Sequence, residues 1–223
     1  MKEQDSSARQ TECLTTPMLF QDLGKKKVVA DFSGGQLSSD GGVLLLEQVD
    51  GGLGISRMLA GCFSDHRNED LVEHSVEELL RQRLFGLALG YEDLNDHGQL
   101  RRDPLMAAAV GKEDVFGENR RNPKDRGFAS ASASTLNRLE LGTKFSDRYR
   151  KIHADPDKVE ASVLELGVRC LPKGREVFIL DFDATDDPLH GRQEGRFFHG
   201  YYDAYCYLPL FCFCGDIPLW AQL

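Results

Sequence analysis

Four aspartates lie within seven residues of one another near the end of the sequence, directly after a short apolar run: Asp181, Asp183, Asp186 and Asp187. Carboxylates this close repel one another unless a cation joins them. Magnesium prefers hard oxygen ligands and takes one or two carboxylates together with substrate phosphates. The segment is therefore a candidate magnesium site for phosphate chemistry. The alternative is an acidic, turn-forming strand exit with a structural role only.

One enzymatic interpretation rests on the local motif alone. The run from Asp181 to Thr185 matches the D-x-D-x-T pattern of haloacid-dehalogenase phosphatases, in which Asp181 would be the nucleophile and Asp183 the general acid. That superfamily needs a parallel βαβ sheet, with a lysine and further acids far downstream. Only 38 residues follow Thr185, and their pattern predicts an antiparallel hairpin instead of a helical crossover.

Three longer segments carry a second interpretation, which rests on resemblance. They read LDFDATDDPLHGRQEGRFFHGYYDAYCYLPLFCFCG (180–215), HSVEELLRQRLFGLALGYEDLNDH (74–97) and STLNRLELG (134–142). Together they resemble the first catalytic block and the N-terminal blocks of bacterial DDE transposases in the thirteen-eighty insertion-sequence group. The resemblance covers roughly residues 20–223 and is weakest in the loop 111–133.

This resemblance implies an RNase H-like catalytic domain whose first three strands are antiparallel, with the first acidic ligand at the end of strand one. Asp181 and Asp183 could both match that ligand. Asp183 is favoured, because related transposases place the acid two residues before a threonine, as in Asp183-Ala184-Thr185. In the family this carboxylate bridges two Mg²⁺ ions that assist cleavage and transfer of DNA strands. The implied partner is DNA at the transposon ends, with self-association in the active complex.

The last seven residues are an apolar strand pattern with no turn after them. We therefore expect a truncated domain that lacks the second aspartate and the glutamate of the family and does not cut DNA by itself. The non-catalytic alternative is a DNA-binding or regulatory remnant of a transposase. The polar first residues lack the apolar centre of a signal peptide, and no apolar run approaches a membrane span, so we expect a cytoplasmic, nucleoid-associated protein.

Charge is unevenly distributed along the chain, although the net charge is −9. Residues 101–151 carry 12 lysines and arginines against seven aspartates and glutamates, a balance of +5 between two acidic flanks. Four cations in this part are candidates for contact with DNA phosphates: Arg120, Arg121, Lys124 and Arg126. A solvated loop rich in arginine is the alternative.

The predicted fold class is α+β, with a mainly helical N-terminal domain before the first strands of the truncated RNase H-like domain. The boundaries are a disordered leader (1–24), a helical domain (25–110), a basic linker or loop (111–134) and the start of the catalytic domain (135–223). Capping residues and apolar periodicity predict helices at 43–49, 75–88, 103–110, 135–141 and 155–167.

Strand patterns concentrate after residue 175, apart from a short candidate at 27–32. A buried strand is predicted at 176–181, followed by strands at 201–214 and 217–223 around a turn at Gly215-Asp216. We expect the first of these three strands to pair antiparallel with the second, and the second with the third.

Overall fold

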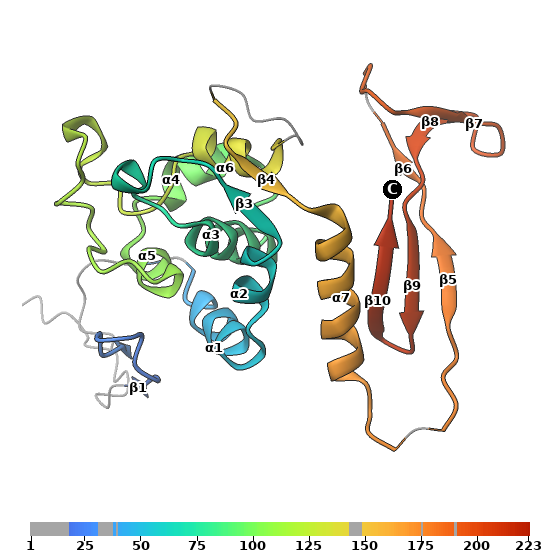
Figure 1. Cartoon of the computed structure of the whole chain (residues 1–223), viewed down its shortest axis with the longest axis horizontal. Coiled ribbons are helices and arrows are strands. Elements are labelled where there is room, and N and C mark those ends of the chain that lie inside the picture. Colours follow the sequence, from blue (N-terminus) through green and yellow to red (C-terminus); the bar gives the residue numbers. More distant parts are fainter. Residues whose placement is uncertain (1–17, 31–37, 39, 143–148, 175, 190) are drawn as a thin grey trace, which may run out of the picture. The chain divides into compact units, whose positions relative to one another are not determined.

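A computed structural model of the protein describes residues 18–30, 38, 40–142, 149–174, 176–189 and 191–223. The chain divides into two compact units (Figure 1). The first comprises Met1–Gly52 and Asp70–Asn137, and the second comprises Leu53–Glu69 and Arg138–Leu223. Helices and small antiparallel sheets together make an α+β protein, as predicted. Within the described part of the chain, no helix has the length and apolar character needed to cross a membrane.

The first unit is mainly helical. Its elements are β1 (Met18–Leu19), β2 (Val29–Ala30), α1 (Val43–Leu53), η1 (Glu69–Leu71), α3 (Val76–Ala88), η2 (Leu94–Asp96), α4 (His97–Leu100), α5 (Pro104–Val110), η3 (Pro123–Asp125) and α6 (Ala133–Glu140). The last residue of α1, the first of η1 and the last three of α6 are assigned to the second unit. α3 packs against α5. The buried core cluster of this unit consists of Val43, Phe85, Leu100, Met106, Ala109 and Val110.

Local capping chemistry sets the ends of these helices. The Ser75 hydroxyl accepts the backbone N–H of Glu78, and the Glu78 carboxylate accepts the backbone N–H of Ser75, which is the predicted capping box. Asp103 caps α5 by accepting two backbone N–H groups, and Gly111 ends that helix at φ 103°. Only glycine adopts this conformation without a steric penalty, so the predicted end of the helix is confirmed.

Three predicted elements before residue 141 differ in extent. α1 continues through Gly51 and Gly52 to Leu53 and does not end at Val49, and α6 begins at Ala133, two residues early. The strand predicted at 27–32 is only Val29–Ala30, and its last two residues lie outside the described ones. It pairs with β1, which lies in the segment predicted as the leader.

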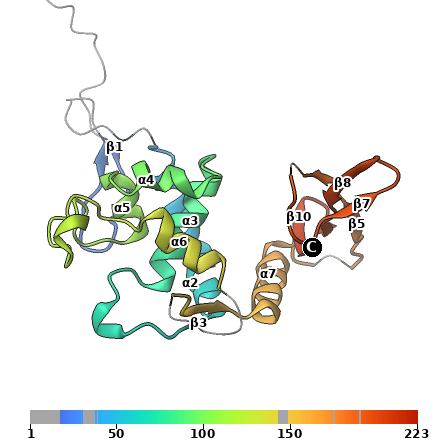
Figure 2. The same ribbon diagram turned by 90° about the horizontal axis from the view of Figure 1, so that it is seen from above.

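The second unit holds α-helices and small antiparallel sheets (Figure 2). Its elements are α2 (Ile55–Ala60), β3 (Phe63–Asp65), β4 (Ile152–Ala154), α7 (Pro156–Cys170), β5 (Asp181–Ala184), β6 (Asp187–Pro188), β7 (Phe197–His199), β8 (Ala204–Tyr207), β9 (Leu210–Cys214) and β10 (Ile217–Gln222). The strand orders are β10-β9-β5, β6-β8-β7 and β3-β4, and every pairing is antiparallel.

Antiparallel pairing of β5 with β9, and of β9 with β10, confirms the predicted order. The position of the first strand was wrong: β5 begins at Asp181, where the predicted strand ends, and residues 176–180 form no strand. The expected burial was also wrong, because Ile179 and Phe182 are 76% and 60% exposed. The predicted strand 201–214 is two strands, β8 and β9, which belong to different sheets.

Helix α7 lies alongside β10 at the edge of the sheet (Figure 1). The close approach occurs at Gly167, where an added Cβ would lie 2.5 Å from the carbonyl oxygen of Pro218 and 2.9 Å from Cδ2 of Leu219. Gly167 was expected to end this helix, but the helix continues to Cys170. Gly167 lets α7 approach β10 closely. The sequence around Gly167 does not indicate this contact.

Candidate active site and nucleic-acid interface

The two candidate metal ligands lie on β5, at the edge of the three-stranded sheet. Asp181 is paired with Phe213 of β9, and Asp183 with Phe211. Residues that face each other across an antiparallel pair project to the same side, so both carboxylates share a face with these two rings. The rings of Phe211 and Phe213 lie 6.1 Å apart between centroids. The two carboxylates therefore lie on the same face of the sheet as two neighbouring aromatic rings.

Both carboxylates are exposed, and within the described part of the chain neither has a hydrogen-bond or ion-pair partner. Alternate residues of a strand are about 7 Å apart, so one hydrated cation can contact both side chains. Two free carboxylates fit magnesium, which completes its shell with water and phosphate oxygens. Among the described residues, no three His, Cys, Asp or Glu side chains are grouped so as to hold a metal ion.

Asp187 follows the same ladder. Asp187 lies in β6, opposite Tyr207, with the same register offset that pairs Asp183 with Phe211. Thr185 N–H donates to the carbonyl of Pro209 at 3.1 Å and continues the pairing between the two sheets. Four residues of strand separate Asp183 from Asp187 by about 13 Å, too far to share one ion without a bend. The geometry thus favours Asp181 and Asp183 together.

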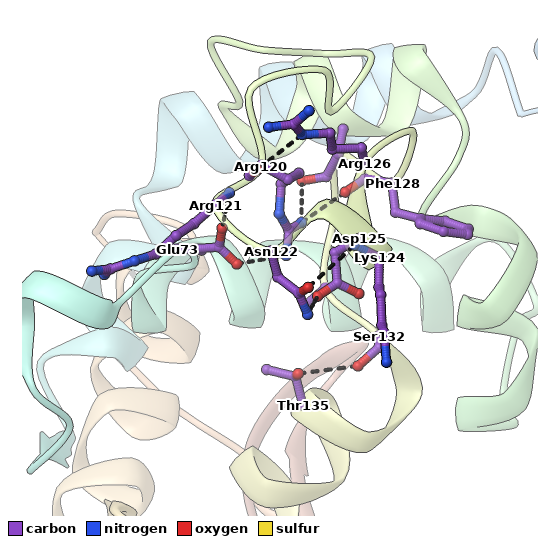
Figure 3. Close-up of polar contacts among 12 residues, drawn as sticks. Glu73, Arg120, Arg121, Asn122, Lys124, Asp125, Arg126, Phe128, Ser132 and Thr135 are labelled. Carbon is purple, nitrogen blue, oxygen red and sulfur yellow. Dashed lines mark hydrogen bonds and ion pairs between the residues drawn. The ribbon is translucent and has the colours of Figure 1, made fainter.

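Arg120, one of the four predicted DNA-contacting cations, points into the first unit (Figure 3). Its guanidinium donates to the Glu73 carboxylate at 2.9 Å and to the carbonyl of Phe128 at 2.7 Å. Only 14% of its side chain is exposed. Arg120 therefore ties the loop to the segment before α3, and its guanidinium is not free to reach a phosphate.

The other three predicted cations are exposed. Arg121 donates its backbone N–H to Glu73 at 2.8 Å and its guanidinium to the carbonyl of Asp70 at 2.5 Å. Arg126 donates through Nε to the carbonyl of Arg120 at 3.5 Å, a marginal distance. No partner is present for the Lys124 ammonium among the described residues. Of the four, Lys124 and Arg126 are the best placed to meet a ligand.

The organising role of Glu73 was missed from the sequence, where it is one acid among many. Partial burial raises the pKa of the Glu73 carboxyl, but hydrogen bonds from the Arg121 N–H and the Arg120 guanidinium outweigh this effect. The resulting pKa lies below its ordinary value. Glu73 is therefore held as a carboxylate that fixes the basic loop. Because Glu73 and Arg120 lie far apart in the sequence, no local pattern indicates that they pair.

A sheet that carries two exposed carboxylates is suited to metal-assisted phosphate chemistry. β5 pairs antiparallel with β9, whereas a haloacid-dehalogenase phosphatase requires a parallel neighbour for this strand. Residues 20–223 match the family described as Transposase DDE domain group 1. The chain therefore belongs to the DDE transposase family. Comparisons with curated proteins and with solved structures found no match.

Proposed function

We propose that this chain takes part in metal-dependent cleavage and transfer of DNA strands at the ends of an insertion sequence of the thirteen-eighty group. The observation that carries the proposal is the pair of exposed carboxylates on β5, which have no hydrogen-bond or ion-pair partner among the described residues, in a chain whose family is the DDE transposases. In this proposal β5, β9 and β10 are the first strands of an RNase H-like domain. The protein would act in the cytoplasm with the nucleoid and associate with itself on the transposon ends.

Asp183 is the proposed first catalytic acid, and Asp181 is a second ligand or shapes the field around the metal. Two Mg²⁺ ions, when bound, activate a water or 3′-hydroxyl and stabilise the leaving oxygen of the phosphodiester. Asp183 would help to hold these ions. Asp181 shares this face of the strand, and the rings of Phe211 and Phe213 limit the space beside it.

The same proposal assigns contact with DNA phosphates to the loop of the first unit. Lys124 and Arg126 are its main contacts, because their cationic groups are exposed and weakly engaged. Arg121 is also exposed and can contribute, although it already donates to the carbonyl of Asp70. Arg120 supports the loop from inside. Such contacts would position the protein on the duplex and would not read its sequence.

The metal ligand can be tested on the chain itself with Mn²⁺, a paramagnetic substitute for Mg²⁺. In the wild type, NMR signals of residues 181–184 and of the facing β9 should broaden first as Mn²⁺ is added, because one or two carboxylates bind the ion weakly but locally. Asp183→Asn should weaken this binding at least about 10-fold, since it keeps the shape and removes the charge. Asp181→Asn should weaken it less.

Asp216→Asn is the matched control, because Asp216 is an exposed acid in the turn between β9 and β10 of the same sheet. It should leave the Mn²⁺ affinity unchanged. Equal broadening in all four proteins would refute a site on β5. A larger effect of Asp181→Asn would move the first acid by two residues. Strand cleavage of a labelled transposon end by the full-length protein, lost in Asp183→Asn, separates catalysis from the alternative of a non-catalytic DNA-binding remnant.

A further inference from the structure

Two consecutive arginines lie over one aromatic ring in the first unit. The guanidinium carbon of Arg101 is 3.6 Å from the centroid of the Phe128 ring, and that of Arg102 is 4.5 Å from it. Arg102 is exposed and Arg101 is half-buried. Among the described residues, neither guanidinium has a hydrogen-bond acceptor or an ion-pair partner. Their donors are therefore available to a ligand.

The segment that carries Phe128 is fixed by hydrogen bonds on both sides of the ring. Arg120 donates to the carbonyl of Phe128 at 2.7 Å, and the N–H of Ser130 donates to the carbonyl of Arg101 at 3.2 Å. The buried amide of Gln82 donates to the carbonyl of Ala131 at 2.9 Å and accepts its N–H at 2.8 Å. The segment that carries Phe128 and the backbone of Arg101 are thus held in place before any ligand arrives, and both guanidinium groups lie against the ring.

The charges around this ring are not balanced within the unit. Partial burial lowers the pKa of Arg101, Asp125 opposes this effect, and the neighbouring cations Arg120 and Arg102 lower the pKa further. A site where cations disfavour one another gains more from a bound anion than a site with paired charges does. Guanidinium groups bind phosphate through several parallel hydrogen bonds, and stacking on a ring leaves their edges free to do so.

We propose that Arg101 and Arg102, held over Phe128, form a binding site for the phosphodiester backbone of DNA. This inference rests on the proposed function, because it takes the ligand to be the DNA on which a transposase acts. The exposed Lys124 and Arg126 lie in the same loop as Phe128, so one strand backbone could contact both parts. The sequence prediction, which was confined to residues 120–126, did not include this pair.

Fluorescence anisotropy with a labelled duplex, repeated over a range of salt concentrations, tests the site. Arg102→Gln should weaken binding about fivefold at low salt and reduce the slope of log K against log salt by about 0.9, the value for one phosphate contact. Arg101→Lys keeps the charge but loses the planar fork, so it should weaken binding with little change in slope. Phe128→Leu keeps all charges and should cost about threefold by removing the ring.

Arg169→Gln on α7 is the matched control, since Arg169 is an exposed arginine already paired with Glu165. If Arg169→Gln weakens binding as much as Arg102→Gln does, the effect is one of total charge and the site is refuted. If inorganic phosphate shifts the side-chain NMR signals of Arg101 and Arg102 and displaces the duplex at low millimolar concentration, the site is a small-anion site and not a DNA site.

A wild-type chain that binds no duplex would also overturn this inference. Mn²⁺ binding at Asp183 involves other residues in the other unit, so that experiment judges the proposed function independently. Normal Mn²⁺ binding at Asp183 with unaltered DNA affinity in Arg102→Gln would remove the arginine site and leave the proposed function intact. Circular dichroism of each variant checks the fold. Because Arg102 is exposed to solvent, Arg102→Gln is the variant with the smallest expected effect on folding.

Discussion

Arg120 and Glu73 form an ion pair with an N–O distance of 2.9 Å across 47 residues of sequence, with 14% and 28% of their side chains exposed. The same carboxylate accepts the backbone N–H of Arg121, and the same guanidinium donates to the carbonyl of Phe128. This pair therefore connects the start of the basic loop, its end and the segment that precedes α3. The shape of the loop depends on it.

Replacing Arg120 by glutamine should loosen the loop without unfolding the helices. The change leaves the Glu73 carboxylate and the carbonyl of Phe128 without a charged donor, which costs about 1–3 kcal/mol. Amide hydrogen exchange of residues 117–131 should accelerate by one to two orders of magnitude, about the ratio given by that energy. Arg126→Gln, which removes a charge but only one marginal hydrogen bond, is the control and should leave exchange unchanged.

The pH dependence of the loop should follow the Glu73 carboxyl. Its pKa is lowered in the folded protein, so its stabilising effect is complete above the ordinary glutamate pKa of about 4.3 and is lost as the pH falls through the lower folded value. The Arg121 amide, which donates to Glu73, should report a titration midpoint below about 4.3 by NMR. In Glu73→Gln the difference in stability from wild type should shrink on acidification. A midpoint above the ordinary value would contradict this assignment.

Several helix boundaries could be predicted because their determinants are local. The capping pair of Ser75 and Glu78, the aspartate–proline starts of α5 and α7, and the left-handed Gly111 all act within a few residues of the chain. The antiparallel order of β5, β9 and β10 could also be predicted, since the tight turn at Gly215-Asp216 joins neighbouring strands.

The errors arose where distant contacts decide the outcome. Nothing near Gly167 in the sequence indicates that Pro218 approaches it, so a packing glycine was interpreted as a helix end. The apolar run 176–180 predicted a buried strand, but its pairing begins only at Asp181. In the same way, the inward orientation of Arg120 depends on Glu73, and the positions of Arg101 and Arg102 depend on Phe128.

Gly167→Ala should destabilise the packing of α7 on β10. The added Cβ would lie 2.5 Å from the backbone oxygen of Pro218, so the helix and strand must separate. Overpacking of this kind costs about 1–3 kcal/mol, which outweighs the higher helix propensity of alanine. Unfolding in urea can be followed through Trp220, which lies on β10 next to the contact residue Leu219. Its midpoint should fall.

The control for this variant is Gly200→Ala, because a Cβ at Gly200 meets nothing within 4 Å and its backbone is not left-handed. This variant should unfold within about 0.5 kcal/mol of the wild type. If both alanine variants unfold with the wild-type midpoint, α7 does not pack on β10 as closely as described. If both are equally destabilised, the effect belongs to glycine replacement in general.

Three of the four cations predicted to contact DNA should separate into two classes when they are changed one at a time. Lys124→Gln and Arg126→Gln remove exposed charges with few internal contacts, so each should weaken binding to any duplex and reduce the salt slope by about 0.9. Arg120→Gln should weaken binding through the loosened loop, with a smaller change in slope, because its guanidinium is engaged by Glu73 and Phe128. Anisotropy titrations at several salt concentrations distinguish the two classes.

The variant Glu73→Gln provides the independent check. It adds net positive charge yet loosens the same loop, so it should bind DNA no better than wild type. Tighter binding by Glu73→Gln, with an unchanged slope for Lys124→Gln and Arg126→Gln, would mean that the loop contributes only general charge and that the phosphate contacts lie elsewhere.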